Sequence, residues 1–554
     1  MEFSKRNKYL LFALLITLNI VFRLPRTAHE HGVDSFFIHN LATTISTYGY
    51  AGWVIHPISF TGLYPLSYAS ASPFFLSGMS QITDISIEYI ILFFSILLGI
   101  FSVFFTFMFA KEVKNDDLFA FLVAFVFSIS PNFLRFTIWD SPKRSLFMVF
   151  LPLFLWALLK CWKSFSGKYV GIAIASFIIL ICSHRICLFI PLILVAFIAA
   201  VILTLVYPKV KNYPVFSNSK VLSTLSYLIF PIAFLLLFFV QFSGIGFYNK
   251  WLPDFYSGYL FEGEDTYIVI LNIAADYFSK MGIVLFFGVI GFFSFQKNVY
   301  NEFGKLFVCL SILILTPFLV MEDYTPEVIS PFLSILVGLG LVSTYNILKQ
   351  RNRITFKRAA TLTVVLCIVV STGFSLYMLD HWQVYESSMS DKTYATASFL
   401  SGDKANGTSV ANSGLLSCQI SSFSGKACLP YGGAYAQANS PEQLIYGSVK
   451  ADEVVTEPVT LSEIISSRVL YKPTNALPNA KDDWAGLMGS FPWANKTKIL
   501  SAKYDAQYVI EDISYSGEYW YWKRYYSRLL VNLHESGNKI YVNGKENIWH
   551  LKGE

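Results

Sequence analysis

Long apolar runs separated by short polar loops dominate roughly the first two thirds of the chain. A helix needs about 20 apolar residues to cross the hydrocarbon core of a bilayer. Runs near that length predict about eleven transmembrane helices, although the shortest runs are the least certain spans. They cover residues 9–22, 87–110, 118–132, 145–162, 169–183, 186–206, 223–243, 281–296, 306–321, 328–347 and 360–379.

Composition and charge agree with this pattern. Hydrophobic residues make up 54% of the 554 residues and charged residues only 14%, which excludes an ordinary soluble protein. Lys and Arg collect in alternate loops, so the positive-inside rule places the N-terminus in the cytoplasm of a multi-pass cell-membrane protein. The net charge of +6 follows from this orientation and indicates no nucleic-acid partner.

The composition turns polar after Asp380. Residues 381–554 are enough for one soluble domain, which an odd number of spans places outside the cell. Helix-like stretches alternate there with strand-like ones, such as the one at Tyr508, and with a hairpin signal at Asn543-Gly544. A membrane domain at 1–380 followed by an extracytoplasmic mixed α/β domain is therefore expected.

Two cysteines, Cys418 and Cys428, stand in the polar region apart from the others. An oxidising compartment would allow a disulfide between them, and two free thiols are the equal alternative. The sequons at Asn406 and Asn495 support an outside location only weakly, because such triplets arise often by chance.

The first outer loop, residues 23–86, is unusually long and begins with crowded polar groups, RLPRTAHEHGVD. An amphipathic stretch follows, in which Phe37, Leu41 and Ile45 share one face, as in a helix lying in the membrane interface. Asp34 stands just before it, where the positive end of the helix macrodipole favours a carboxylate. Position alone favours a simple helix cap over a catalytic acid.

A second outer loop places Asp140 beside Lys143 and Arg144, next to hydrocarbon. Charges at membrane depth are costly and usually face a cavity or a partner. The ordinary alternative is that Asp140 starts a helix while the two cations extend toward the membrane surface. For each residue taken alone, that alternative carries at least equal weight.

A tight turn at His184 and Arg185 separates two very apolar runs. An imidazole and a guanidinium at such a turn suit an anionic headgroup, because Arg can bind phosphate through two parallel hydrogen bonds. The same turn decides the number of spans. If it is not a turn, every later loop changes sides.

Two further outer loops carry clustered acids that could hold Mg²⁺ or Mn²⁺ against a diphosphate. Solvated loop charge is the simpler interpretation and is preferred. The acids are Asp254, Glu262, Glu264, Asp265, Glu322, Asp323 and Glu327.

Several stretches of the chain resemble archaeal membrane proteins of the GT-C superfamily, the polyprenyl-phosphate-dependent glycosyltransferases. They are GVDSFFIHNLATTISTYGY, GLYPLSYASASPFFLSG, RFTIWDSPKR, SHR and EVISPFLSILVGLGL. The ending, YDAQYVIED with KIYVNGKENIWHL, is similar to the close of their soluble domains. The resemblance implies a GT-C-like helical membrane domain with an extracytoplasmic C-terminal domain.

The resemblance also implies an inverting glycosyltransferase. Its donor would be a dolichyl- or polyprenyl-phosphate sugar, and its acceptor a glycan, lipid or protein at the outer membrane face. Asp34 matches the superfamily's first-loop catalytic acid, acting as general base, and Asp140 is a second acid in a matching loop. The residues that would bind the lipid phosphate and stabilise its charge are Lys143, Arg144, His184, Arg185 and Tyr64.

Two departures from the superfamily limit this expectation. The soluble domain lacks the Trp-Trp-Asp-Tyr-Gly motif of oligosaccharyltransferases, so transfer of a whole oligosaccharide to Asn is not expected. The loop before 328–347 also lacks the Arg found in many relatives. Two rivals remain, a transporter or flippase for a lipid-linked substrate and a noncatalytic membrane protein whose outer domain binds a partner.

Overall fold

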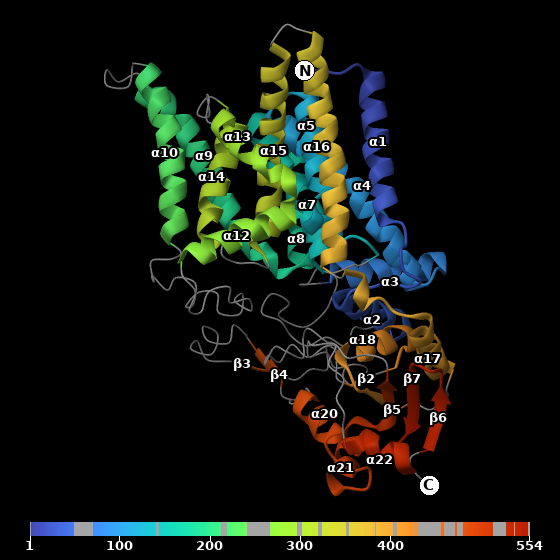
Figure 1. Ribbon diagram of the computed structural model, residues 1–554. Helices are drawn as coiled ribbons and strands as arrows, with labels where there is room; N and C mark the ends of the chain where they lie inside the picture. Colours follow the sequence, from blue (N-terminus) through green and yellow to red (C-terminus); the bar gives the residue numbers. More distant parts are fainter. Residues whose placement is uncertain are drawn as a thin grey trace.

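A computed structural model of the chain shows a helical bundle joined to a C-terminal domain that contains a β-sheet (Figure 1). The N-terminus lies at the end of the bundle far from the C-terminal domain. The residues that the structure describes are 2–48, 70–139, 143–211, 219–240, 266–295, 302–319, 324–350, 354–382, 384–402, 407–426, 428–429, 456–458, 471–473, 480–513, 528–536 and 538–551.

Each of the eleven predicted apolar runs overlaps a helix of the bundle. The helices are α1 (Lys5–Arg23), α4 (Ile87–Val113), α5 (Asp117–Ile129), α7 (Lys143–Lys163), α8 (Gly167–Ser183), α9 (Ile190–Lys211), α10 (Ser219–Val240), α13 (Phe286–Phe295), α14 (Phe303–Leu315), α15 (Thr325–Gln350) and α16 (Ile354–His381).

The number of membrane crossings is smaller by a stricter criterion. Length and apolar composition qualify five of the described helices as spans, or six if α12 (Thr266–Met281) and α13 form one bent span. The bend between these two is 115° and falls at Gly282, whose φ of +88° favours glycine. The structure supports a multi-pass helical membrane protein, and the count of eleven is not confirmed.

The predicted turn between the fifth and sixth apolar runs is confirmed. Helix α8 ends at Ser183, the short 3₁₀ helix η1 (Arg185–Phe189) follows, and α9 starts at Ile190. The two apolar runs are therefore two helices, as the sequence indicated.

Short helices lie across the end of the bundle that faces the C-terminal domain (Figure 1). The predicted amphipathic helix is present as the first of them, and its apolar face is buried. Its polar face does not face water, because the Asn40 amide donates to the Ser421 hydroxyl at 2.7 Å. The Ser422 hydroxyl donates to the Phe36 carbonyl at 2.6 Å. The helices are α2 (Val33–Tyr48) and α3 (Ala71–Thr83), and the serines belong to α18 (Gly414–Ser424). A further short helix, α6 (Pro131–Arg135), follows α5.

The C-terminal domain is mixed α/β, as expected. Its five-stranded sheet has the order β2-β1-β5-β7-β6, with β2, β1 and β5 parallel and β7 antiparallel to both of its neighbours. A separate antiparallel pair joins β3 and β4. The strands are β1 (Thr408–Ala411), β2 (Cys428–Leu429), β3 (Thr456–Pro458), β4 (Tyr471–Pro473), β5 (Ala506–Asp512), β6 (Asn538–Val542) and β7 (Glu546–His550).

Side chains alternate across this sheet and supply two apolar cores. Val509 and Trp549 share one core with buried residues of three helices of the C-terminal domain, and Tyr508 and Ile510 share the other with residues of two helices of that domain. Residues of the bundle side, Phe37 in the first core and Phe36 in the second, also belong to them. The first group of helices is α20 (Ala480–Met488), α21 (Asn495–Tyr504) and α22 (Arg528–Ser536), and the second is α17 (Asp391–Gly402) and α18.

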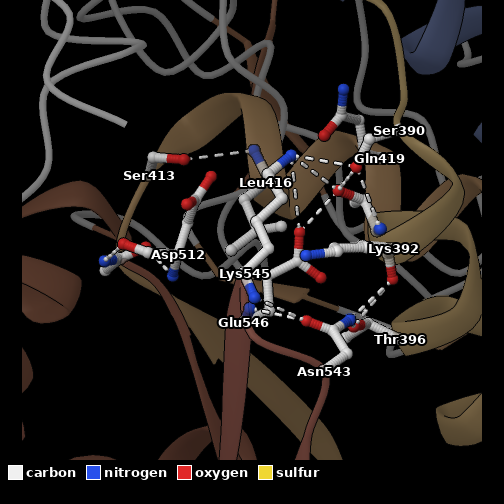
Figure 2. A network of polar contacts seen from close by, with 12 residues as sticks. Ser390, Lys392, Thr396, Ser413, Leu416, Gln419, Asp512, Asn543, Lys545 and Glu546 are labelled. Carbon is white, nitrogen blue, oxygen red and sulfur yellow. Dashed lines mark hydrogen bonds and ion pairs between the residues drawn. The ribbon is translucent and has the colours of Figure 1, made fainter. Parts of the chain in front are cut away.

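The predicted hairpin at Asn543-Gly544 joins β6 and β7, and the φ of Gly544 is +80°. Figure 2 shows that this turn is fixed to α17, the first helix of the C-terminal domain. The Asn543 amide donates to the Lys392 carbonyl and to the Thr396 hydroxyl, each at 2.8 Å. The hairpin near the end of the chain is thereby tied to the helix that follows the bundle.

Cys418 and Cys428 are both buried free thiols in α18 and β2. The disulfide considered from the sequence is therefore not formed, and the alternative of two free thiols holds. Burial raises the pKa of the Cys428 thiol to about 12, which keeps it in the protonated, unreactive form.

Candidate active site

Asp34 lies in the first turn of α2, at the junction of the bundle and the C-terminal domain. The first backbone bond of α2 runs from the Phe36 N–H to the Gly32 carbonyl at 3.1 Å, so Gly32 is the cap. The interpretation of Asp34 as a simple cap is therefore wrong. Within the described residues its half-buried carboxylate has no hydrogen bond or ion pair. The positive end of a helix favours a carboxylate, which is a group that can accept a proton or bind a ligand.

Two histidine–glutamate pairs hold the loop that leads into α2. His39 Nδ1 lies 2.6 Å from Glu30 Oε1, and His29 Nδ1 lies 2.9 Å from Glu88 Oε1. The Glu30 N–H also donates to the Glu88 carboxylate at 3.3 Å. Burial raises the pKa of the Glu30 carboxyl, and the His39 imidazole acts in the opposite direction. These four residues were not singled out from the sequence, although the HEH string was a visible signal of crowded polar groups.

The segment that follows α16 forms hydrogen bonds with the same loop. The Gly32 N–H donates to the Ser387 hydroxyl at 2.9 Å, and the Met389 N–H donates to the Glu30 carbonyl at 3.2 Å. The φ of Gly32 is +93°, a conformation that favours glycine. Ser387 ends the 3₁₀ helix η6 (Val384–Ser387). Both parts of the molecule therefore set the backbone immediately before Asp34.

A second polar cluster brings two predicted residues together around Tyr324. The Arg144 guanidinium lies 5.7 Å from the centre of the Tyr324 ring, and the His184 ring lies 5.6 Å from it. Arg144 Nη1 is 3.3 Å from Oε1 of the buried Glu327. The prediction that Arg144 and His184 share one end of the bundle fits this geometry. The sequence did not identify Tyr324, and it gave no ion-pair role to Glu327.

His184 also shapes the turn in which it stands. Its Nδ1 accepts a hydrogen bond from the Ile186 N–H at 3.2 Å, and the side chain is buried. This bond makes Nδ1 an acceptor, so the neutral ring carries its proton on Nε2. His184 therefore has a structural role in addition to any role in ligand binding.

The remaining predicted site residues are only partly covered by the structure. Asp140 and Tyr64 lie outside the described residues. Lys143 begins α7 and Arg185 begins η1, but their side chains lie outside the description as well. Of the acid clusters considered for Mg²⁺ or Mn²⁺, only Glu327 is described, and it pairs with Arg144. No three described His, Cys, Asp or Glu side chains come together as metal ligands.

Comparison with solved structures identifies the fold. An oligosaccharyltransferase from Archaeoglobus fulgidus tethered with an acceptor peptide matches with 12% identity and a TM-score of 0.59, over 92% of this chain and 70% of that chain. The archaeal oligosaccharyltransferase AglB from A. fulgidus, in complex with an inhibitory peptide and a dolichol-phosphate, matches with 11% identity and a TM-score of 0.57, over 93% and 70%. ArnT from Cupriavidus metallidurans bound to undecaprenyl phosphate covers 99% of both chains at 10% identity, with a TM-score of 0.49.

These neighbours are membrane glycosyltransferases of the GT-C superfamily, and the chain shares the fold of the archaeal ones. The resemblance drawn from short sequence motifs is thus confirmed at the level of fold. No family model matches the chain, and no curated protein matches it.

Proposed function

We propose that this protein is an inverting glycosyltransferase that takes a sugar from a dolichyl- or polyprenyl-phosphate donor. It transfers the sugar to a glycan, lipid or protein acceptor at the outer membrane face. The observation that carries the proposal is the Asp34 carboxylate, which has no partner among the described residues and begins a helix beside the bundle. The solved neighbours with this fold include one bound to a dolichol-phosphate and one tethered to an acceptor peptide, which supports this donor and acceptor chemistry.

Asp34 acts as the general base in this proposal. It takes the proton of the acceptor hydroxyl or amide while that group attacks the anomeric carbon from the side opposite the phosphate. The bond from the anomeric carbon to the phosphate oxygen breaks, and its electron pair leaves with the polyprenyl phosphate. The configuration of the sugar is inverted because one displacement occurs. Among the described residues, no hydrogen-bond donor or cation occupies the oxygens of this carboxylate.

Arg144 and His184 receive the leaving phosphate. A guanidinium has five N–H donors, so Arg144 can bind a phosphate oxygen while it keeps its contact with Glu327. His184 lies on the same Tyr324 ring and adds a second donor through Nε2. Lys143, Arg185 and Tyr64 are proposed to complete this phosphate site, and Asp140 to be a second acid near Asp34.

A divalent metal is a separate part of the proposal. Mg²⁺ binds through one or two carboxylates together with substrate phosphates, and Asp34 is the described carboxylate that could contribute. No step above passes through the metal. Transfer measured with and without a chelator, followed by addition of Mg²⁺ or Mn²⁺, decides whether the reaction needs one.

The direct test is sugar transfer by the purified protein with synthetic polyprenyl-phosphate sugars. Asp34→Asn should reduce transfer about 100-fold or more, since a general base contributes about that much. Asp84→Asn is the matched control, because Asp84 is an exposed aspartate with a φ of 57° that Asn also tolerates. Full transfer by Asp34→Asn would contradict the assignment of the base. The absence of transfer from every donor, with an unchanged glycan profile in a deletion strain, would favour the noncatalytic rival.

A further inference from the structure

Trp139 has a backbone conformation that its side chain disfavours. Its φ is +41°, and it is 3% exposed. The other described non-glycine residues with positive φ, Asp84 and Asp505, are aspartates at helix ends, where Asp tolerates this conformation. A bulky residue keeps such a conformation only where its surroundings impose it, and such residues concentrate at functional sites.

The surroundings of Trp139 belong to the loop before Asp34. The Trp139 carbonyl accepts a hydrogen bond from the His31 N–H at 3.4 Å. Its indole N–H donates to the Glu88 carbonyl at 3.2 Å. Glu88 in turn binds His29 through its carboxylate. Trp139 thus contacts the end of the loop, at His31, and helix α4, which carries Glu88.

The start of the same loop, at Arg23, is held by Thr137. Thr137 precedes Trp139 by two residues in the sequence. Arg23 Nη2 donates to the Thr137 hydroxyl at 2.8 Å, and Nη1 donates to the Asn19 side chain at 2.9 Å. The guanidinium lies against Gly99, where an added Cβ would be 2.7 Å from Cζ. Arg23 is fully buried, and in the described part of the chain it has no ion pair.

We propose that residues 137–139 position the Asp34 carboxylate by holding both ends of the loop from Arg23 to His31. Asp34 follows that loop by three residues. Because the carboxylate has no hydrogen bond within the described residues, the backbone is the described feature that sets its place. A displacement of about 1 Å at a reacting group can cost about 100-fold in rate, so the loop must be held closely. Arg23, Thr137 and Trp139 are positioning residues, and this inference rests on the proposed function.

Stability alone does not account for these features. A buried guanidinium without a counter-charge destabilises a fold, and so does a strained bulky residue. Arg23 and Trp139 carry one such cost each. Arg23 binds Thr137, and Trp139 lies two residues after Thr137. Positioning of the loop before Asp34 explains why the two occur together.

Trp139→Phe tests the attachment of Trp139 to Glu88, because it keeps a buried aromatic ring and removes the indole N–H. It also makes the side chain smaller, a change that the control shares. The matched control is Trp484→Phe, since Trp484 is also 3% exposed and its indole N–H donates to the Ala411 carbonyl at 2.9 Å. Trp139→Phe should lower kcat about tenfold with KM unchanged, and it should speed amide exchange at residues 31–36. Trp484→Phe should change neither kcat nor that exchange by more than about twofold.

Thr137→Val tests the attachment of Arg23 to Thr137, because it removes the hydroxyl that accepts the hydrogen bond from Arg23. Thr106→Val is its control, because the Thr106 hydroxyl is equally buried and has no hydrogen-bond partner in the described structure. Thr137→Val should lower kcat about tenfold and speed the same exchange, whereas Thr106→Val should do neither. Equal thermal unfolding of the paired variants would show that the loss of kcat is not a loss of folded protein.

The proposal is overturned if each variant and its control have the same kcat and the same amide exchange at residues 31–36. It is also overturned if exchange speeds up while kcat is unchanged in an active protein. Failure of the proposed function looks different, since the wild type would then transfer no sugar. In that case the exchange measurement alone tests whether residues 137–139 hold the loop, and unchanged exchange refutes it.

Discussion

The two ends of the helical bundle hold their charged residues in different ways. At the end with the N-terminus, the buried Asp117 carboxylate binds Lys8 at 3.0 Å and Lys111 at 2.7 Å. Glu112 binds two further lysines in the same way, each at 2.7 Å. Each of these acids has two cations, and each joins helices that are separate in the sequence. Charge at this end fastens the bundle together.

At the end that faces the C-terminal domain, Arg144 pairs with Glu327, but other charges are not balanced in this way. Within the described residues, Arg23 has no ion pair and Asp34 has neither an ion pair nor a hydrogen bond. Glu30 and Glu88 pair with histidines, whose own charge depends on pH. Unpaired charge beside a membrane is costly and is kept where it serves a reaction or a ligand. This difference is expected if one end is structural and the other carries the proposed reaction.

The comparison is tested most strongly by neutralising one acid at each end. Asp34→Asn should lower kcat about 100-fold or more and leave thermal unfolding unchanged, because no described contact is lost. Asp117→Asn should leave kcat, measured per folded molecule, within about twofold. A large fall in kcat for the soluble, folded Asp117→Asn protein would break the distinction between the two ends.

Stability should respond in the reverse order. Asp117→Asn leaves Lys8 and Lys111 without their carboxylate, and the free energy of unfolding should fall by about 2 kcal/mol. That is less than for a fully buried pair, because both lysines are partly exposed. Glu302→Gln is the control, since Glu302 binds Lys305 at 2.7 Å but is 43% exposed, and its loss should cost about 0.5 kcal/mol or less. Equal losses, measured by denaturant unfolding in detergent, would contradict the structural role of Asp117.

The sequence predicts the parts of this architecture that local pattern encodes. Apolar runs located the helices of the bundle, and Asn543-Gly544 located a hairpin whose glycine has a φ of +80°. The turn at His184 was visible because two charged groups interrupt an apolar stretch. The position of Asp34 at a helix start followed from the amphipathic pattern after it.

The rest depends on contacts between residues far apart in the sequence. Arg144 and Glu327 are separated by 183 residues, and Phe36 and Ser422 by 386. No local pattern specifies such partners, since packing of whole helices decides them. For this reason the sequence placed Arg144 in a phosphate site without its carboxylate partner. It also described the polar face of α2 as lying at the membrane interface, where the structure packs it against α18.

Gly99→Ala sharpens the comparison by moving Arg23 without removing its charge. The added Cβ would lie 2.7 Å from Cζ and Nε of the buried guanidinium, which must then leave its present position, where it binds Thr137. The free energy of unfolding should fall by about 1 kcal/mol, and kcat should fall with it. Gly171→Ala is the control, because nothing lies within 4 Å of a Cβ at this helical glycine. A fully active Gly99→Ala protein would show that the position of Arg23 does not matter.

The smallest expected effect concerns pH. Groups at the two ends of the bundle should differ in how they make the free energy of unfolding depend on pH. Burial lowers the pKa of His31 to about 4, while a backbone contact with Ile138 acts in the opposite direction. The unfolded chain, with an ordinary His pKa of about 6.5, therefore binds a proton first on acidification. The free energy of unfolding that the buried neutral His31 contributes above a pH of about 6.5 is lost as the pH falls. The loss is about 0.7 kcal/mol between pH 7 and 6. The raised pKa of Glu30 acts in the opposite sense, because its protonated form suits the buried site.

His31→Phe should remove this loss and flatten the unfolding free energy between pH 7 and 6. His550→Phe is the control, because the His550 ring contacts Tyr508 edge-on at 5.5 Å much as the His31 ring contacts Tyr385 at 5.3 Å. Asp117→Asn removes a carboxylate, and the ordinary pKa of an Asp carboxyl, about 3.9, lies well below pH 6, so this variant should keep the wild-type slope between pH 7 and 6. If His31→Phe and Asp117→Asn change the slope equally, the pH response does not belong to the end of the bundle that carries Asp34.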